Sequence, residues 1–198
     1  MQVVVFDFFG VIAQPRNIYS AIAEILKIKD DRIRPLYNAY ESGALTRTGF
    51  WKKLGVEDYA EIEKRTAKRF TLDPDFKSVH SELKKTYTTA ILSNCNTALL
   101  HALTKRFGLE ESFEAVVVSE EAKSMKPDHK IYRALLAELD VNAKECVFVD
   151  DRLENLKAAH ELGMTTVFHL VQPENSDYKP DYTIDDLNEL VEIMEGLG

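Results

Sequence analysis

The chain has 198 residues, of which 45% are apolar and 29% charged, an ordinary globular composition and enough chain for one large domain or a domain with a small insert. Its 25 basic and 33 acidic residues give a formal charge of −8, which argues against a general nucleic-acid-binding or anionic-membrane surface. The only cysteines, Cys95 and Cys146, exclude a disulfide framework and a cysteine-based zinc site.

The first predicted element is a buried strand over residues 3–6, and it ends at Asp7. Burying a carboxylate is costly unless the group is paired, solvated or bound to a metal, so Asp7 needs either a partner or a function. The apolar run is short and no basic segment precedes it. We therefore expect neither a signal peptide nor a membrane-spanning segment, and we expect a cytoplasmic protein.

Residues 14–80 contain several helical patterns and no convincing strand. One face of the first helix is apolar and includes Ile18 and Ile22. Further helical patterns cover residues 30–41, 46–54 and 58–70. Because this segment is too long for a simple crossover between two strands, we expect an inserted helical cap.

The remainder of the chain alternates between strand and helix patterns. The predicted strands are short apolar runs at residues 89–92, 115–118, 146–149 and 165–168. Helical patterns cover residues 97–107, 127–139 and 152–162, and a short strand and a closing helix end the chain. Apolar runs of this kind suit parallel strands that are buried on both faces. The sequence predicts an α/β fold, in which residues 1–13 and 81–198 form a doubly wound, Rossmann-like parallel sheet core and residues 14–80 form an inserted α-helical cap.

Polar residues follow the ends of the predicted strands, where ligands bind in open α/β sheets. Asp7 follows the first strand, "SNCN" follows the second, and Asp150 and Asp151 follow the fourth. Carboxylates that meet at one edge repel each other unless a cation lies among them, and oxygen ligands suit Mg²⁺. Lys126, just before a predicted helix, and the "SNCN" donors would complete an anion site. This combination indicates phosphoryl chemistry.

These segments resemble the four motifs of the haloacid dehalogenase superfamily, in order and across nearly the whole chain. The matching segments are "VVVFDFFGV", "AILSN", "KSMKPD" and "CVFVDD". The insert resembles a helical cap of the C1 type. Within it, "ESGALTRTGFWKKL" is similar to the cap segment of the branch that contains sugar-phosphate phosphatases and 2-haloacid dehalogenases.

The resemblance implies catalytic roles for matching positions. Asp7 aligns with the nucleophile that forms an aspartyl intermediate and so divides one difficult displacement into two easier ones. Ser93 would hold a phosphate oxygen, and Asn94 would support it. Lys126 would neutralise the transferring group and orient Asp7. The implied enzyme is a phosphatase that acts on a small phosphorylated metabolite, as a monomer or homodimer.

The resemblance also implies Mg²⁺ as a cofactor. Asp7, Asp150 and Asp151 would bind the ion directly or through water, and Phe9 would contribute its backbone carbonyl. Asn155, one helical turn beyond the acidic pair, is predicted to brace these carboxylates.

Phe9 departs from the family pattern and leaves alternatives open. Most phosphatases of this superfamily have an aspartate there as a general acid and base, and such a group contributes ~10²–10⁴-fold to the rate. The 2-haloacid dehalogenases carry a tyrosine there and need no metal, so a dehalogenase that forms an ester at Asp7 is the first alternative. Against it, Arg32 and Arg34 are only loose counterparts of the dehalogenase cap arginine. A non-catalytic binding protein on this fold is the further alternative.

Overall fold

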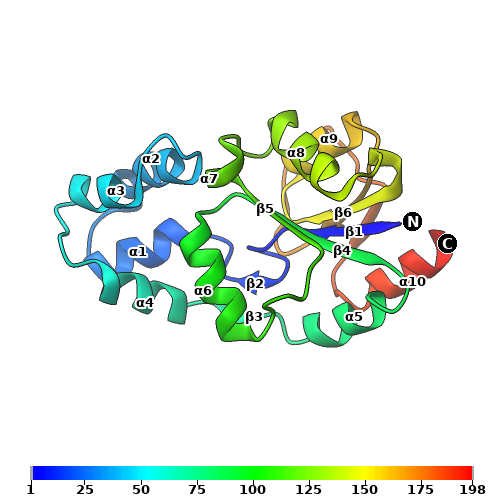
Figure 1. Cartoon of the computed structure of the whole chain (residues 1–198), viewed down its shortest axis with the longest axis horizontal. Coiled ribbons are helices and arrows are strands. Elements are labelled where there is room, and N and C mark those ends of the chain that lie inside the picture. Colours follow the sequence, from blue (N-terminus) through cyan, green and yellow to red (C-terminus); the bar gives the residue numbers. More distant parts are fainter. Residues whose placement is uncertain (1, 198) are drawn as a thin grey trace.

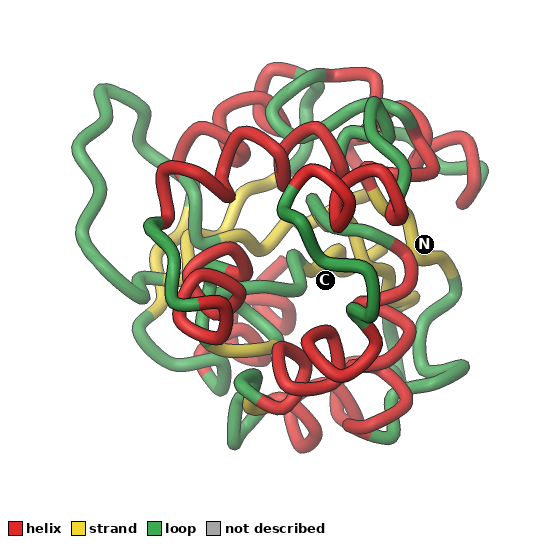
Figure 2. Tube along the Cα trace, turned by 90° about the vertical axis from the view of Figure 1, so that its left-hand side faces the viewer, coloured by secondary structure: helices red, strands yellow, loops and turns green. Residues whose placement is uncertain are grey.

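A six-stranded parallel sheet forms the centre of the computed structural model, which describes residues 2–197. The strand order is β5-β4-β1-β6-β7-β8. Helices cover both faces of the sheet (Figure 2), which confirms the predicted doubly wound, Rossmann-like α/β core. The strands are β1 (Val3–Phe6), β4 (Thr88–Ser93), β5 (Ala115–Val118), β6 (Cys146–Asp150), β7 (Thr165–His169) and β8 (Tyr182–Ile184).

Strand β1 shows why its sequence is apolar throughout. Val3 and Val5 pack into one hydrophobic cluster and Val4 and Phe6 into the other, because successive side chains of a strand point to opposite faces. All four are fully buried. On the first face lie α8 (His129–Leu139) and α9 (Leu153–Glu161), and on the second lie α5 (Phe76–Leu83), α6 (Thr97–Phe107) and α10 (Glu189–Leu197) (Figure 1).

Four helices between β1 and β4 form a layer beyond one end of the sheet (Figure 1). They are α1 (Ile18–Leu26), α2 (Asp30–Glu41), α3 (Arg47–Lys53) and α4 (Ala60–Lys68). At their base, β2 (Ala13–Gln14) and β3 (Thr71–Leu72) pair in antiparallel fashion. The expectation of no strand within residues 14–80 is therefore wrong at its edges, since a two-residue strand is too short to produce a periodic pattern.

The helical insert and the sheet share one hydrophobic cluster. It includes Val4 and Ile91 from the sheet and Ile33 and Trp51 from the insert. Helix α5 begins inside the segment predicted as cap but packs against α10 on the second face of the sheet (Figure 1). The division into a cap of residues 14–80 and a core stays a proposal.

Most helices lie where the sequence predicts them, and α2 and α6 match their predicted ranges. Helix α8 was expected to start at Pro127 but begins at His129, because the side chain of Asp128 accepts a hydrogen bond from the Lys130 backbone N–H at 2.8 Å and so caps the helix. The short helix α7 (Ser119–Ala122) was not predicted. Within residues 2–197, every helix is too short or too polar to cross a bilayer.

Candidate active site

Three carboxylates meet at the carboxyl ends of β1 and β6. These strands are parallel neighbours in which Phe6 lies opposite Val149, so the residues that follow them are placed side by side. Asp7, Asp150 and Asp151 each contribute an oxygen to a group whose members lie within 4.8 Å of one another. All three residues are buried. The structure thus brings together the three acids that the sequence places after separate strands.

Lys126 lies against two of these acids. Its Nζ is 2.9 Å from Asp7 Oδ1 and 2.7 Å from Asp150 Oδ2, and its side chain is almost fully buried. Burial alone would lower the pKa of Lys126, but Asp150 and Asp7 together raise it, so the ammonium group is charged. Asn94 holds the lysine backbone: its Oδ1 accepts from the Lys126 N–H at 2.7 Å, and its Nδ2 donates to the Lys126 carbonyl at 2.9 Å.

Lys126 alone does not balance the two buried carboxylates that it contacts, Asp7 and Asp150. The pKa of Asp150 is raised to about 6. Burial is the main cause and Asp7 adds to the increase, whereas Lys126 opposes it. The pKa of Asp151 is raised to about 8, chiefly by burial and also by Asp150 and Asp7, although Arg16 and Lys126 oppose the shift. A divalent cation among these groups would remove that excess negative charge, and an all-oxygen donor set suits a hard ion such as Mg²⁺. The three residues therefore fit the predicted metal.

Asn155 braces Asp150, as the sequence predicts. Its Nδ2 donates to both carboxylate oxygens, at 3.1 and 3.0 Å. The Asn155 carbonyl accepts in turn from the hydroxyl of Tyr132, at 2.8 Å. This chain of hydrogen bonds runs from α8 through the first turn of α9 to the end of β6 and limits the orientations open to Asp150.

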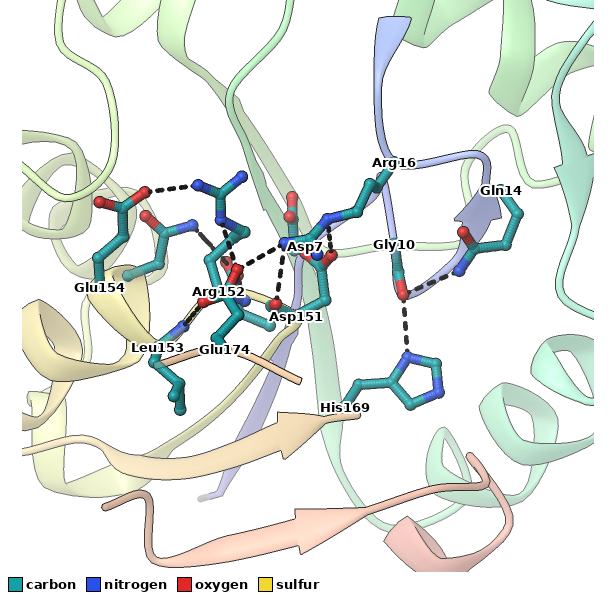
Figure 3. Close-up of polar contacts among 12 residues, drawn as sticks. Asp7, Gly10, Gln14, Arg16, Asp151, Arg152, Leu153, Glu154, His169 and Glu174 are labelled. Carbon is teal, nitrogen blue, oxygen red and sulfur yellow. Dashed lines mark hydrogen bonds and ion pairs between the residues drawn. The ribbon is translucent and has the colours of Figure 1, made fainter. Parts of the chain in front are cut away.

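Arg16 is a residue of the site that sequence reasoning missed. Its Nε lies 2.6 Å from Asp151 Oδ2, and its Nη2 donates to the Asp151 carbonyl at 3.1 Å and to Glu174 Oε1 at 2.9 Å (Figure 3). Arg16 follows the short strand β2 and is separated from Asp151 by 135 positions. No periodicity or motif marks such a residue, because only the fold brings it to the acids.

Gly10 allows the chain to turn tightly beside Asp151. Its φ is +95°, and a Cβ at this position would lie 2.4 Å from the carboxyl carbon of Asp151. The Gly10 carbonyl accepts from Gln14 Nε2 at 3.1 Å and from His169 Nδ1 at 2.9 Å, which fixes the turn (Figure 3). A side chain at position 10 would displace the acid or the turn.

The two remaining predicted residues are Ser93, which has a hydroxyl group, and Phe9, whose side chain is apolar. Ser93 is fully buried at the end of β4, and its Oγ has no hydrogen-bond partner among residues 2–197. Ser93 does not line the cavity that contains Asp7 and Lys126, so its predicted contact with a phosphate oxygen stays a proposal. The ring of Phe9 packs against Phe8 and Phe70, with centroids 5.1 Å from each, so this side chain serves packing and carries no proton to transfer.

A cavity of about 330 Å³ opens onto these groups between the sheet and the helical insert. Its lining combines residues that follow the strands with residues from α1 and α2. Among them are Asp7 and Asp151 from the first set and Tyr19, Arg34 and Glu41 from the second, and Lys126 joins them from the segment between α7 and α8. The arrangement places a carboxylate, a fixed cation and a candidate metal site together at one cavity.

The model of the haloacid dehalogenase-like hydrolase family matches residues 1–163. The chain belongs to the haloacid dehalogenase-like hydrolases. It is therefore an enzyme, as the four motifs imply, and the family match includes every acid of the site and Lys126.

Relatives of this haloacid dehalogenase-like hydrolase include both phosphatases and dehalogenases. A glyceraldehyde 3-phosphate phosphatase of Methanopyrus kandleri is 35% identical over 47% of this chain and 43% of that protein. A ribulose-1,5-bisphosphate 5-phosphatase of Halopiger xanaduensis is 31% identical over 63% of the chain and 57% of that protein. An (S)-2-haloacid dehalogenase of a Pseudomonas species is 27% identical over 70% of the chain and 66% of that protein. The matches thus span less than two thirds of either phosphatase.

Solved structures share the fold over the whole length of this hydrolase. A phosphatase of the same superfamily from Thermococcus onnurineus superposes with a TM-score of 0.75 at 24% identity and 99% coverage of both chains. The L-2-haloacid dehalogenase of Xanthobacter autotrophicus gives a TM-score of 0.77 at 20% identity and complete coverage of both. The fold is therefore common to both activities and does not separate them.

Proposed function

We propose that this hydrolase is a Mg²⁺-dependent phosphatase that cleaves a small phosphomonoester through an aspartyl-phosphate intermediate at Asp7. The observation that carries the proposal is the group of three buried carboxylates beside Lys126, since these acids could hold a metal ion and the displacement of a halide needs none. The named activities of the phosphatase relatives support a small phosphorylated metabolite as substrate.

In the first chemical step, an oxygen of Asp7 attacks phosphorus, and the bond from phosphorus to the leaving oxygen breaks. Lys126 orients Asp7 through their 2.9 Å ion pair and offsets charge on the phosphoryl oxygens. The free hydroxyl of Ser93 donates to one of these oxygens. Water then cleaves the aspartyl phosphate and releases inorganic phosphate.

Asp7, Asp150 and Asp151 are the side chains that would hold Mg²⁺, together with the backbone carbonyl of Phe9. The bound ion would supply positive charge opposite the phosphoryl group. Asn155 and Arg16 act as positioning residues here, because the first orients Asp150 and the second pairs with Asp151.

Cleavage of 2-haloacids is the second candidate function. The observation in its favour is Arg34, a cap arginine that lines the cavity and is able to bind a substrate carboxylate. The non-catalytic alternative has no such support, since the nucleophile, the lysine and both further acids are in place.

Hydrolysis of p-nitrophenyl phosphate with and without Mg²⁺ tests the proposal, with Asp7→Asn as the control. We expect phosphate release that requires the metal and is lost in the variant, because the amide is a poor nucleophile. Chloride release from 2-chloropropionate is measured in parallel. Metal-independent chloride release without phosphatase activity would contradict the proposal and establish the second candidate.

A further inference from the structure

A phosphatase with Phe9 in its first motif needs an acid from elsewhere if it is to release a poor leaving group. Glu41 is the last residue of α2, and among the described residues it is the only acidic side chain of helices α1–α4 that lines the cavity with Asp7 and Lys126. It lies at the start of the "ESG" sequence that turns the chain out of α2. The cavity thus contains a carboxyl group that the proposed function has not used.

The end of α2 is attached to the core, so Glu41 has a fixed place over the site. The Oγ of Ser119 donates to the Glu41 backbone carbonyl at 2.6 Å. One helical turn earlier, the hydroxyl of Tyr37 accepts from Asn96 Nδ2 at 2.9 Å. Ser119 and Asn96 are both buried residues that follow strands of the sheet. Two hydrogen bonds therefore fix the face of α2 that carries Glu41.

The turn after Glu41 passes close to α7 at Gly43. Gly43 has φ +69°, and a Cβ there would lie 2.7 Å from the backbone carbonyl of Glu120 in α7. The absence of a side chain at position 43 allows the end of α2 to lie against α7, and a Cβ there would force the two segments apart.

The carboxyl group of Glu41 is free to act on a ligand. The residue is 8% exposed, and no hydrogen bond or ion pair joins this carboxyl to another residue within 2–197. Burial raises its pKa well above the ordinary value, with a further increase from Asp7 and a smaller opposing effect from Lys126. Glu41 thus has a carboxyl group that lacks a partner in the cavity, and its surroundings favour the protonated form.

We propose that Glu41 is the general acid and base of this enzyme, supplied by the cap at the point where Phe9 cannot act. The proposal rests on the phosphatase function. As the Asp7 oxygen bonds to phosphorus, the phosphorus–oxygen bond to the leaving group breaks, and that oxygen takes the electron pair and the proton of Glu41. Water then bonds to phosphorus while its proton passes to the Glu41 carboxylate, and the bond from phosphorus to Asp7 breaks. The second step restores both residues.

The test compares Glu41→Gln with the unchanged enzyme on two substrates, p-nitrophenyl phosphate and glycerol phosphate, in rapid-quench measurements of the first turnover with Mg²⁺. Release of glycerol needs a proton, so we expect its rate to fall ~10²–10⁴-fold. p-Nitrophenolate leaves as a stable anion, so its first-turnover release stays close to the unchanged rate. Loss of the base then appears as a burst of p-nitrophenol followed by slow turnover.

Three controls separate this role from a structural one. Glu61→Gln removes an exposed carboxyl from α4 and should leave both substrates unaffected. Glu41→Asp keeps the acid and should recover part of the glycerol release. Circular dichroism establishes that each variant is folded. Equal losses on both substrates, or no loss on either, would overturn the role of Glu41. If the unchanged enzyme cleaves neither phosphate, the proposed function fails and this inference fails with it.

Discussion

Single residues decide whether the acids at the site can adopt their arrangement. Gly10 is the clearest case, because its backbone passes so near Asp151 that even a methyl group would overlap the carboxyl group. Its φ of +95° is a second restriction, since residues with a Cβ rarely adopt that conformation. Gly10 is thus needed for two reasons. It allows the tight turn, and it leaves room for Asp151, which lies far away in the sequence but next to Gly10 in the fold.

We predict that Gly10→Ala weakens Mg²⁺ binding and lowers the free energy of unfolding by more than about 1 kcal/mol. In the unchanged protein, Mg²⁺ at 100 times its dissociation constant should add about 2.7 kcal/mol and raise the melting temperature by roughly 5–10 °C. Differential scanning fluorimetry with and without Mg²⁺ measures both effects.

Gly196→Ala is the matched control for this substitution. Gly196 lies in α10, and a Cβ there would meet nothing within 4 Å. This variant should keep the full response to Mg²⁺ and should be slightly more stable, because alanine favours a helix. A Gly10→Ala protein with an unchanged Mg²⁺ response would contradict the role given to Gly10.

At the scale of elements, His80 joins α5 to β4 in the second face of the sheet. Its Nε2 lies 3.0 Å from Thr89 Oγ1, and its ring stacks on Phe76 at 5.2 Å between centroids. Burial and, to a smaller extent, the nearby Lys84 lower the pKa of His80 to about 4. The folded protein therefore holds this imidazole neutral where an unfolded chain would protonate it.

The sign of the pH effect follows from these proton affinities. Between pH 6.5 and 4 the unfolded chain binds a proton at position 80 that the folded protein does not, so stability falls as the solution is acidified through that range. The contribution is at most about 1.4 kcal/mol per pH unit. Urea denaturation from pH 7 to 4.5 should show a steeper loss for the unchanged protein than for His80→Gln.

His101→Gln provides the comparison, because His101 is exposed on α6. This variant should keep the steep dependence of the unchanged protein. Identical slopes for all three proteins would show that His80 has no part in the acid response.

At the scale of the whole molecule, the helical insert and the sheet are parts of one hydrophobic cluster. Trp51 is the only tryptophan of the chain and lies in α3, where it is buried and its Nε1 donates to Glu63 at 2.8 Å. The cluster continues from Trp51 and Ile33 to Val4 and Ile91 of the sheet without interruption. A shared cluster of this kind favours cooperative unfolding of both parts.

We predict that Trp51 fluorescence and far-UV circular dichroism report the same unfolding transition in urea. The fluorescence reports on the helical insert alone, because Trp51 lies in α3. The dichroism reports on the helices of both the insert and the core. Coincident midpoints and slopes are expected. A fluorescence transition at lower urea than the dichroism transition would indicate that the insert unfolds independently.

The sequence by itself determined the sheet and the candidates for its chemistry. Buried parallel strands need continuous apolar runs, and those at residues 3–6 and 115–118 coincide with β1 and β5. The acids and the serine stand directly after strands, and parallel strands end at the same edge. The meeting of Asp7 with Asp150 and Asp151 was therefore predictable, because each position depends on local pattern and strand direction.

Only the tertiary structure decided which other residues reach the site. Arg16 and Glu41 come from a loop and a helix end with no distinctive local pattern, and they meet the acids because α2 is bound to the core and the chain turns at Gly10. The short strands β2 and β3 were likewise beyond prediction, since pairing across distant segments creates them. Contacts between segments far apart in sequence depend on packing, which local periodicity does not encode.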